Sequence, residues 1–300
     1  MKNKIRSPFF YVGDKYKIMP QIIELFPKSI NNYYEPFLGG GSSVMYVEAK
    51  KYILNDIDKN VIELHKYISS YSKKQSSLFE QLFKVIKKYK LSCSYLGIKV
   101  PDELKKKYIK TYYSKFNKEN YINLRNDFNK TNDTLKLYLL LIYGFNHMIR
   151  FNRKGEFNLP VGNVDFNKNV YDALLNYLKF VDDKEIEYSN NDYINFVKEI
   201  KFNEKDFMYL DPPYLISNSE YNKNWSIEDE LNLYDLIDQL DKKNVYFGLS
   251  NLIEHKGNKN HFLEERMRKY NVYEIKSNYI SRFDNTIKDS KEVYITNYEK

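Results

Sequence analysis

The sequence predicts an α/β fold in which an open, doubly wound sheet is interrupted by a mainly helical insert. Short apolar runs that end at polar or acidic residues alternate with helical patterns in residues 1–66 and again in 171–300, as in parallel strands joined by crossover helices. Between residues 67 and 170 the apolar spacing is helical instead. Three hundred residues with 42% hydrophobic content can bury a proper core.

The first strand is predicted to end at a glycine-rich turn. An aromatic opening and a tight turn occupy residues 7–15, an amphipathic helix is expected from Pro20 to Phe26, and residues 33–44 fit a strand, a glycine turn and a helix. Glycines allow positive φ and close approach of the backbone to a ligand, and Ser42 is expected to cap the following helix. The turn lacks the lysine of a phosphate-binding loop, and Glu35 beside it suits a cationic group such as the amine of a methionine moiety.

Two further strands are predicted to end at acids. The strand Tyr52–Asn55 leads to Asp56, where doubly wound folds place the acid that binds a ribose diol. Alternatively, Asp56 only caps the helix that starts near Asp58. The strand Glu185–Tyr188 leads to Asp192, which either accepts the N6 protons of a cofactor's adenine or caps the helix over 193–200. The sequence does not choose between the two roles of Asp192.

The insert is predicted to be helical and to end in a β-hairpin. Helical patterns cover residues 76–90, 101–113, 118–129 and 134–144. Residues 144–160 fit a hairpin in which Gly155 supplies the positive φ of the turn. A two-stranded ribbon can enter the major groove of DNA, where arginine pairs with guanine and an apolar side chain contacts a thymine methyl. Candidates are Asn146, Met148 and Arg150, although a plain surface hairpin has the same turn chemistry.

The net charge of +8 is concentrated in the middle of the chain. Residues 71–155 hold 19 Lys and Arg against 6 Asp and Glu, so this span carries +13 and the remainder −5. A basic middle attached to a mildly acidic remainder favours an insert that binds a polyanion with salt-dependent affinity. The competing interpretation is a solvated, lysine-rich surface.

The most informative strand is Phe207–Leu210, which ends at Asp211-Pro212-Pro213-Tyr214. The prolines terminate the strand and leave Asp211 at its carboxyl end, where open α/β sheets bind ligands. A carboxylate and a backbone carbonyl held rigid by proline can accept both protons of a planar amine, such as adenine N6, and re-aim its lone pair at an electrophile. Tyr214 can stack on a base taken out of its helix. The alternative is a strand-end turn with a buried tyrosine.

The last third completes the alternation of strands and helices. The expected elements are a polar linker at Ser217–Asn224, a helix over 227–240, a strand Val245–Leu249 ending at Ser250-Asn251, a loop at 254–260 that opens another helix, and closing strands Tyr273–Ile280 and Glu292–Asn297 around a polar loop at 281–291. The linker is a candidate for ordering on DNA.

Composition argues against several other kinds of site. The single cysteine, Cys93, excludes disulfides and cysteine metal sites, and the four histidines show no ligand spacing, so we expect no metal and a reducing, cytoplasmic location. No signal peptide is evident, and no uncharged apolar run is long enough to span a bilayer.

Nearly the whole chain resembles Dam-like DNA adenine-N6 methyltransferases of the alpha arrangement and the restriction-modification type. The likeness is firmest at residues 33–58, 144–160, 207–214 and 291–299. It implies a Rossmann-like, S-adenosylmethionine-dependent methyltransferase sheet at 1–66 and 171–300, with a target-recognition domain at 67–170. It also implies duplex DNA as the substrate, base flipping, a monomer on DNA, and a cognate restriction endonuclease that acts on the same site.

The resemblance assigns roles residue by residue. Catalytic roles fall to Asp211, Pro212, Pro213 and Tyr214. Cofactor contacts are expected from Tyr11, Lys15, Glu35, Pro36, Phe37, Gly39, Gly41, Asp56, Asp192, Tyr193 and Asp211, with Asp56 on the ribose. DNA contacts are expected from Phe145, Asn146, Met148, Arg150, Asn152 and Arg153. Departures at Phe10, His147 and residues 161–163 from the members that methylate GATC mean that the resemblance does not fix the recognised site.

Two other functions compete with adenine methylation of DNA. An RNA adenine or protein glutamine methyltransferase would usually begin the tetrapeptide with asparagine, whereas this chain has Asp211. A non-catalytic DNA-binding module on the same fold would have no need for both Glu35 and Asp56. The sequence therefore favours transfer of a methyl group from S-adenosylmethionine to adenine N6.

Overall fold

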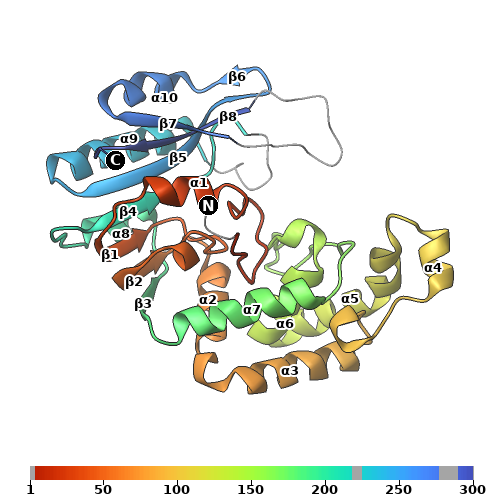
Figure 1. Ribbon diagram of the computed structural model, residues 1–300. Coiled ribbons are helices and arrows are strands. Elements are labelled where there is room, and N and C mark those ends of the chain that lie inside the picture. The colour runs from red at the N-terminus through yellow and green to blue at the C-terminus, as the bar shows by residue number, and fades with distance from the viewer. Residues whose placement is uncertain (1–3, 218–224, 277–289, 300) are drawn as a thin grey trace.

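The computed structural model describes residues 4–217, 225–276 and 290–299, and its centre is one mixed sheet (Figure 1). Its strands are β1 (Ile30–Glu35), β2 (Ala49–Asn55), β3 (Glu185–Ser189), β4 (Phe207–Leu210), β5 (Tyr246–His255), β6 (Asn258–Lys259), β7 (Asn271–Ile275) and β8 (Ser290–Thr296). They lie in the order β3-β2-β1-β4-β5-β8-β7, and β6 pairs with β5. Strands β1 to β5 pair in parallel and β8 is antiparallel to both neighbours, which confirms the predicted fold class.

The order of the strands reverses direction between β1 and β4, and this determines where the site lies. The chain proceeds outward from β1 through β2 to β3, and then returns to the other side of β1 with β4 and β5. Open α/β sheets bind ligands outside the carboxyl ends of the strands at such a point. The register, in which Tyr34 pairs with Met208, therefore brings the residues that follow β1 and β4 to one crevice.

Alternating side chains of the central strands enter two different cores. Tyr33 and Phe207 pack on one face of the sheet with Met19 and Ile22 of α1 (Met19–Ile22), which continues as a 3-10 turn at Ile23–Leu25. Their chain neighbours Tyr34 and Met208 pack on the other face against α8 (Tyr193–Lys198) and α9 (Ile227–Lys242). This alternation follows from the two-residue period of a strand, and α10 (His261–Arg266) covers the same face near β5.

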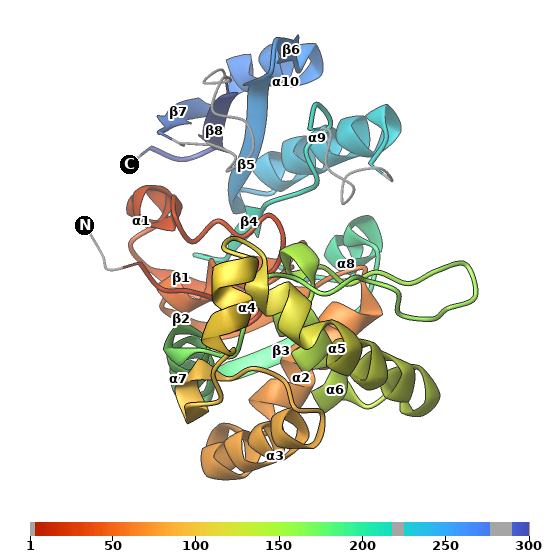
Figure 2. The ribbon, with the colours of Figure 1, turned by 90° about the vertical axis from the view of Figure 1, so that its right-hand side faces the viewer.

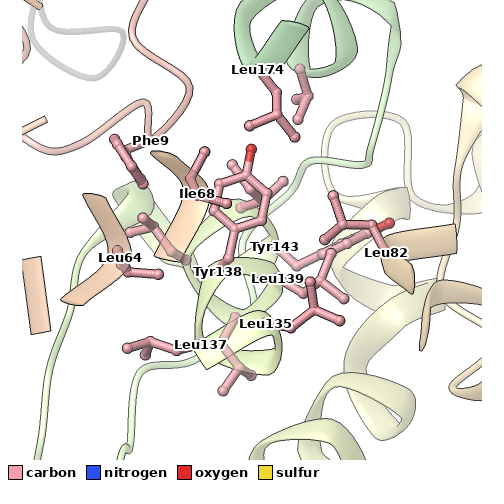
Figure 3. Packing of buried hydrophobic residues seen from close by; sticks show 14 of the residues in the cluster. Phe9, Leu64, Ile68, Leu82, Leu135, Leu137, Tyr138, Leu139, Tyr143 and Leu174 are labelled. Carbon is pink, nitrogen blue, oxygen red and sulfur yellow. The ribbon is translucent and has the colours of Figure 1, made fainter. Parts of the chain in front are cut away.

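The insert consists of helices that share one core with the neighbouring helices α2 (Lys59–Ser69) and α7 (Lys168–Val181). Its own helices are α3 (Gln75–Lys88), α4 (Asp102–Lys107), α5 (Tyr112–Thr131) and α6 (Thr134–Tyr143), with shorter 3-10 turns at 72–74, 94–96 and 145–147. Figure 3 shows Tyr138 and Leu139 of α6 within this core, and the ring of Phe9 from the N-terminal segment lies 6.1 Å from the Tyr138 ring. The predicted boundaries at 67 and 170 fall inside α2 and inside α7, and the division into two domains stays a prediction.

Several local expectations were wrong. The expected helix over 101–113 ends at Lys107, and α5 starts at Tyr112 rather than near 118. After the glycine turn the chain forms only a 3-10 turn at Val44–Tyr46, and Ser42 caps nothing, because its hydroxyl donates to the Asp14 carboxylate. Strand β5 does not end at Ser250-Asn251 but continues to His255.

The extension of β5 has a local cause in its hairpin to β6. Lys256 and Gly257 both have positive φ, 52° and 80°, between the pairs His255–Asn258 and Glu254–Lys259. Two consecutive residues of positive φ form the turn that matches the twist of a β-hairpin.

Most of the linker at 217–224 and of the polar loop at 281–291 lies outside the described residues. No helix in the described part of the chain is long and apolar enough to cross a membrane.

Candidate active site

A cleft of about 1110 Å³ opens at the carboxyl ends of β1 and β4. Most of its walls come from four parts of the chain: the N-terminal segment at 10–18, the glycine turn at 37–43, Asp211 to Tyr214, and Leu252 with His255 of β5. Residue 211 and the glycine turn therefore line one cavity. A methyl donor bound at the turn and an amine held by Asp211 would have to share such a cavity. Basic side chains also line it, at Lys4, Arg6, Lys15, Lys17, Lys256 and Lys276.

Glu35 ends β1 as a buried carboxylate on the wall of this cleft, and the residue is only 2% exposed. It accepts hydrogen bonds from the hydroxyls of Ser43 and Tyr33, the latter at 2.9 Å. Burial raises the pKa of Glu35 to about 8; the two hydroxyls oppose this rise, and the negative charges of Asp211 and Asp56 add to it. The site can therefore hold either a proton or a ligand's positive charge at this carboxyl group.

The glycine turn is fixed in place by its surroundings. Gly39 and Gly41 have φ of +46° and +67°, and a Cβ on Gly41 would lie 2.9 Å from His65 Cε1. The His65 Nε2 atom is 2.9 Å from the Gly39 carbonyl, and its Nδ1 atom is 2.8 Å from the Tyr177 hydroxyl. Burial lowers the pKa of His65 to about 4, so its ring is neutral at ordinary pH. Sequence reasoning treated His65 only as a non-ligand; its place on the apolar face of α2 was the available signal.

Asp56 braces the same turn from the end of β2. Its carboxylate accepts the Gly39 N–H at 2.8 Å and the Asp58 N–H at 2.9 Å. Burial raises its pKa to about 6, against those two hydrogen bonds. Asp58, not Asp56, is the N-cap of α2, since its carboxylate accepts from Asn60 N at 2.8 Å. The alternative in which Asp56 only caps that helix is therefore wrong.

Four of the predicted cofactor residues are not among the described residues that line the cleft: Pro36, Asp56, Asp192 and Tyr193. Asp192 is the N-cap of α8 and accepts from Ile194 N at 2.9 Å, so the capping role left open by the sequence is confirmed. The Tyr193 ring lies 5.1 Å from Phe37, which does line the cleft, and 5.7 Å from Trp225. A contact of any of these four residues with a cofactor stays a prediction.

Asp211 lies at the centre of a small charged cluster. The Lys15 ammonium is 3.1 Å from Asp211 Oδ1 and 4.4 Å from the centroid of the Tyr214 ring. The Tyr214 hydroxyl donates to the same Oδ1 atom at 3.1 Å. Burial raises the pKa of Asp211, while Lys15 and the Tyr214 hydroxyl act to lower it. The four predicted residues Asp211 to Tyr214 all line the cleft.

One member of this cluster was missed by sequence reasoning. Glu292 on β8 has a fully buried side chain, and its Oε1 atom lies 3.6 Å from Lys15 Nζ. The same oxygen accepts from the Tyr214 hydroxyl at 3.0 Å. An acid within the otherwise apolar run Glu292 to Ile295 was the only signal in the sequence, and it gave no indication of which residues it would face.

The hairpin of the insert forms as predicted. Figure 2 shows it extending away from the helices. Phe151 and Phe157 form an antiparallel bridge, Asn152 N donates to Glu156 O at 2.8 Å, and Gly155 has φ of +76°. Arg150 donates to the Asn158 side chain at 2.9 Å and to its carbonyl at 3.0 Å, so its guanidinium also stabilises the hairpin.

The other predicted DNA contacts occupy different parts of the hairpin. Phe145 and Asn146 are exposed at its base, where Asn146 has φ of 55°, and Arg153 is exposed at its tip. Met148 packs against the core of the insert. The role of these residues in binding DNA stays a prediction. In the described residues no group of three or more His, Cys, Asp or Glu side chains is placed to hold a metal ion.

Comparison with known proteins shows which family and which relatives this chain resembles. Residues 11–280 match the model of D12 class N6 adenine-specific DNA methyltransferases. The chain is 32% identical to modification methylase StsI of Streptococcus sanguinis over 99% of its own length and 44% of that protein. It is 33% identical to type II methyltransferase M.FokI of Planomicrobium okeanokoites over 98% of its length and 43% of that protein.

The chain thus spans less than half the length of these two relatives. It is also 22% identical to the DNA adenine methylase of Escherichia coli K12, over 83% of this chain and 81% of that protein. The family match covers most of the chain, including the glycine turn, the hairpin and the Asp-Pro-Pro-Tyr tetrapeptide. The chain therefore belongs to the D12 class N6 adenine-specific DNA methyltransferase family.

Proposed function

We propose that this chain transfers a methyl group from S-adenosylmethionine to adenine N6 at a specific site in duplex DNA. The observation that carries the proposal is that Asp211 and the glycine turn beside Glu35 meet in one cleft, at the ends of adjoining strands. Its volume of about 1110 Å³ exceeds the usual range for one small ligand. A methyl donor and an extrahelical base both fit such a space.

The residues of the cleft suit S-adenosylmethionine in charge. The described partners of the buried Glu35 carboxylate are two hydroxyls, and its raised pKa favours a cationic partner, which the amine and sulfonium of the donor provide. Asp56, already held at the glycine turn, is proposed to bind the ribose. Further contacts are proposed for Tyr11, Lys15, Pro36, Phe37, Gly39, Gly41, Asp192 and Tyr193.

The chain's own residues are proposed to orient the amine. When bound, S-adenosylmethionine supplies a methyl group whose bond to sulfur breaks, with the electron pair left on sulfur, as adenine N6 forms the new carbon–nitrogen bond. Asp211 accepts a hydrogen bond from N6 and then the proton that N6 gives up, while the Pro212 carbonyl accepts the second N–H. Tyr214 stacks on the flipped base. Catalysis is then positioning with electrostatic stabilisation of the amine, and no metal is needed.

The insert is proposed to supply recognition of DNA through its hairpin, with Phe145, Asn146, Met148, Arg150, Asn152 and Arg153 as contacts. The relatives named as modification methylases and type II methyltransferases support a second proposal, that a restriction endonuclease of the same specificity accompanies this chain. We also propose that the chain acts on DNA as a monomer.

The proposal is tested by sequencing methylated adenines in DNA from cells that express the chain. One short sequence context, methylated at adenine N6, is the expected result. The matched control is Asp211→Ala, which should lose the modification and still bind duplex DNA. Unmodified DNA from cells with well-expressed, folded wild-type protein would refute the activity, and methylated RNA alone would assign the chain to a different substrate.

A further inference from the structure

We infer that Glu292 is a positioning residue. When the adenine amine reaches Asp211, the Lys15 ammonium and the Tyr214 hydroxyl shift their ion pair and hydrogen bond from Asp211 to Glu292. This inference rests on the proposed methyl transfer and adds a residue to it. Glu292 follows Lys15 by most of the length of the chain and lies on β8, far in sequence from the tetrapeptide. Its Oε1 atom nevertheless contacts the same two groups that occupy Asp211 Oδ1.

Glu292 is held rigidly and is costly to bury. Its backbone pairs with Leu252 of β5 on one side and with Ile275 of β7 on the other, and its side chain is fully buried. A buried carboxylate is tolerated when it is paired and hydrogen-bonded, and here Lys15 and the Tyr214 hydroxyl meet that need. Because β8 holds the Glu292 carboxylate in place, the positions of its partners Lys15 and Tyr214 are restricted as well, and such preorganisation favours catalysis.

The geometry creates competition for one oxygen of Asp211. Lys15 at 3.1 Å and the Tyr214 hydroxyl at 3.1 Å both point at Oδ1, the kind of atom that must accept from adenine N6. The hydroxyl has one proton and two carboxylate acceptors, and the Lys15 ammonium is likewise shared between the two carboxylates. Glu292 gives both donors a second acceptor, at 3.0 Å and 3.6 Å, so that Asp211 is released to the base without leaving Lys15 unpaired.

The test compares Glu292→Gln with Glu274→Gln, which removes an exposed carboxylate on the neighbouring strand β7. The glutamine in Glu292→Gln retains an acceptor for the Tyr214 hydroxyl but no charge for Lys15. Methyl transfer is measured with a labelled donor on unmethylated bacterial DNA. We expect kcat to fall by about 10- to 100-fold in Glu292→Gln, as for a loss of about 1.4 to 2.7 kcal/mol in the transition state, with KM for DNA little changed. Glu274→Gln should match the wild type.

The dependence of kcat on pH separates positioning from a merely structural role. Among the described residues, the charged and titratable groups around Asp211 include Lys15, Tyr209, Tyr214 and Glu35, and Glu292 shares Lys15 and Tyr214 with it. Without the charge of Glu292, Lys15 pairs more closely with Asp211, and both changes lower the pKa of Asp211. The acid limb of the profile should move to lower pH in Glu292→Gln. A structural role would reduce the amount of folded enzyme and leave the limb in place.

If Glu292→Gln folds but is too unstable for kinetic measurements, the double variant Lys15→Met/Glu292→Gln removes both charges together, and Lys15→Met alone completes the cycle. We expect its urea midpoint to exceed that of Glu292→Gln, because the pair is coupled; strictly additive effects would contradict the inference. Wild-type kcat and an unmoved acid limb in Glu292→Gln would overturn the role of Glu292 alone. A folded wild-type chain that methylates no DNA would overturn the proposed function and this role with it.

Discussion

At the scale of single residues, Glu35 on the wall of the cleft and Asp56 behind the glycine turn hold their protons more tightly in the folded chain than in the unfolded one. Burial raises the pKa of Glu35 to about 8 and that of Asp56 to about 6. In both cases the charged form is penalised by loss of water, and the nearby hydroxyl or N–H donors recover only part of that loss. In the ligand-free protein the ionised form of these carboxylates is therefore destabilised, and a bound cationic ligand would stabilise it.

We predict that the ligand-free protein loses stability as pH rises from about 4.5 to 8, because the unfolded chain releases the Glu35 proton first. Glu35→Gln should flatten the dependence of the unfolding free energy on pH over that window, by an amount on the order of a few kcal/mol across it. The control is Glu199→Gln, at an exposed carboxylate. Urea unfolding at several pH values is the measurement, and equal slopes in all three proteins would contradict the assignment.

The glycine turn allows a second prediction at this scale. Gly41→Ala adds a Cβ at 2.9 Å from His65 Cε1 at φ of +67°, whereas Gly97→Ala adds one in open space at a similar φ of +76°. The left-handed backbone should lower the free energy of unfolding of both variants by about 1–2 kcal/mol. The loss should be larger in Gly41→Ala, because the hydrogen bonds of His65 hold its ring against the new Cβ. Calorimetry should also show weaker binding of S-adenosylmethionine by Gly41→Ala only. Identical losses in the two variants would show that His65 does not hold the turn.

At the scale of secondary-structure elements, hydrogen bonds of the Asn152 side chain hold the turn at the tip of the insert's hairpin. Asn152 Oδ1 accepts from Lys154 N at 2.9 Å and from Glu156 N at 3.0 Å, and its amide donates to the Glu156 carboxylate at 2.8 Å. These bonds give the turn the conformation that Gly155 permits. Asn152, predicted as a DNA contact, therefore also shapes the element that is proposed to read DNA.

We predict that Asn152→Ala lowers the affinity for duplex DNA at the methylated site by about 10-fold, because a loosened tip must be ordered on binding. The affinity for S-adenosylmethionine should not change, since the hairpin does not line the cleft at this residue. Asn195→Ala, at an exposed position of α8, is the control. Fluorescence anisotropy with a labelled duplex measures the first affinity and calorimetry the second. A parallel loss of both would point to general unfolding.

At the scale of the whole molecule, charge and architecture divide the chain in the same way. The basic span 71–155 contains the helices α3 to α6, which lie beside the sheet and not on its faces (Figure 1). Their core nevertheless includes Phe9 and Tyr11 of the N-terminal segment, and Tyr11 also lines the cleft. The insert and the wall of the cleft are thus packed together.

We predict that binding to duplex DNA weakens steeply with salt and that the basic insert provides the effect. Lys106→Gln with Lys107→Gln, at exposed positions of α4, should reduce the slope of log affinity against log salt by up to about 1.8. The matched double variant Lys198→Gln with Lys201→Gln lies outside the insert. Equal slopes for the two double variants would favour a merely solvated lysine surface.

The sequence by itself determined the α/β class, the strands that end at Glu35, Asp56 and Asp211, and the hairpin around Gly155. Each of these follows from a local signal: an apolar run of strand length, a proline that stops it, or a glycine where φ is positive. The tetrapeptide also indicated the chemistry, because few residue types can accept the protons of a planar amine.

Only the tertiary structure decided which side chains meet. His65 reaches the glycine turn because α2 packs beneath it, and Glu292 reaches Lys15 and the Tyr214 hydroxyl because β8 inserts next to β5. Asp56 holds the glycine turn through Gly39 N instead of capping α2, and the Ser42 hydroxyl donates to Asp14, because contacts between separate segments outweigh local capping propensity. Such pairings depend on packing between segments more than a hundred residues apart in some cases, and no pattern along the chain encodes them.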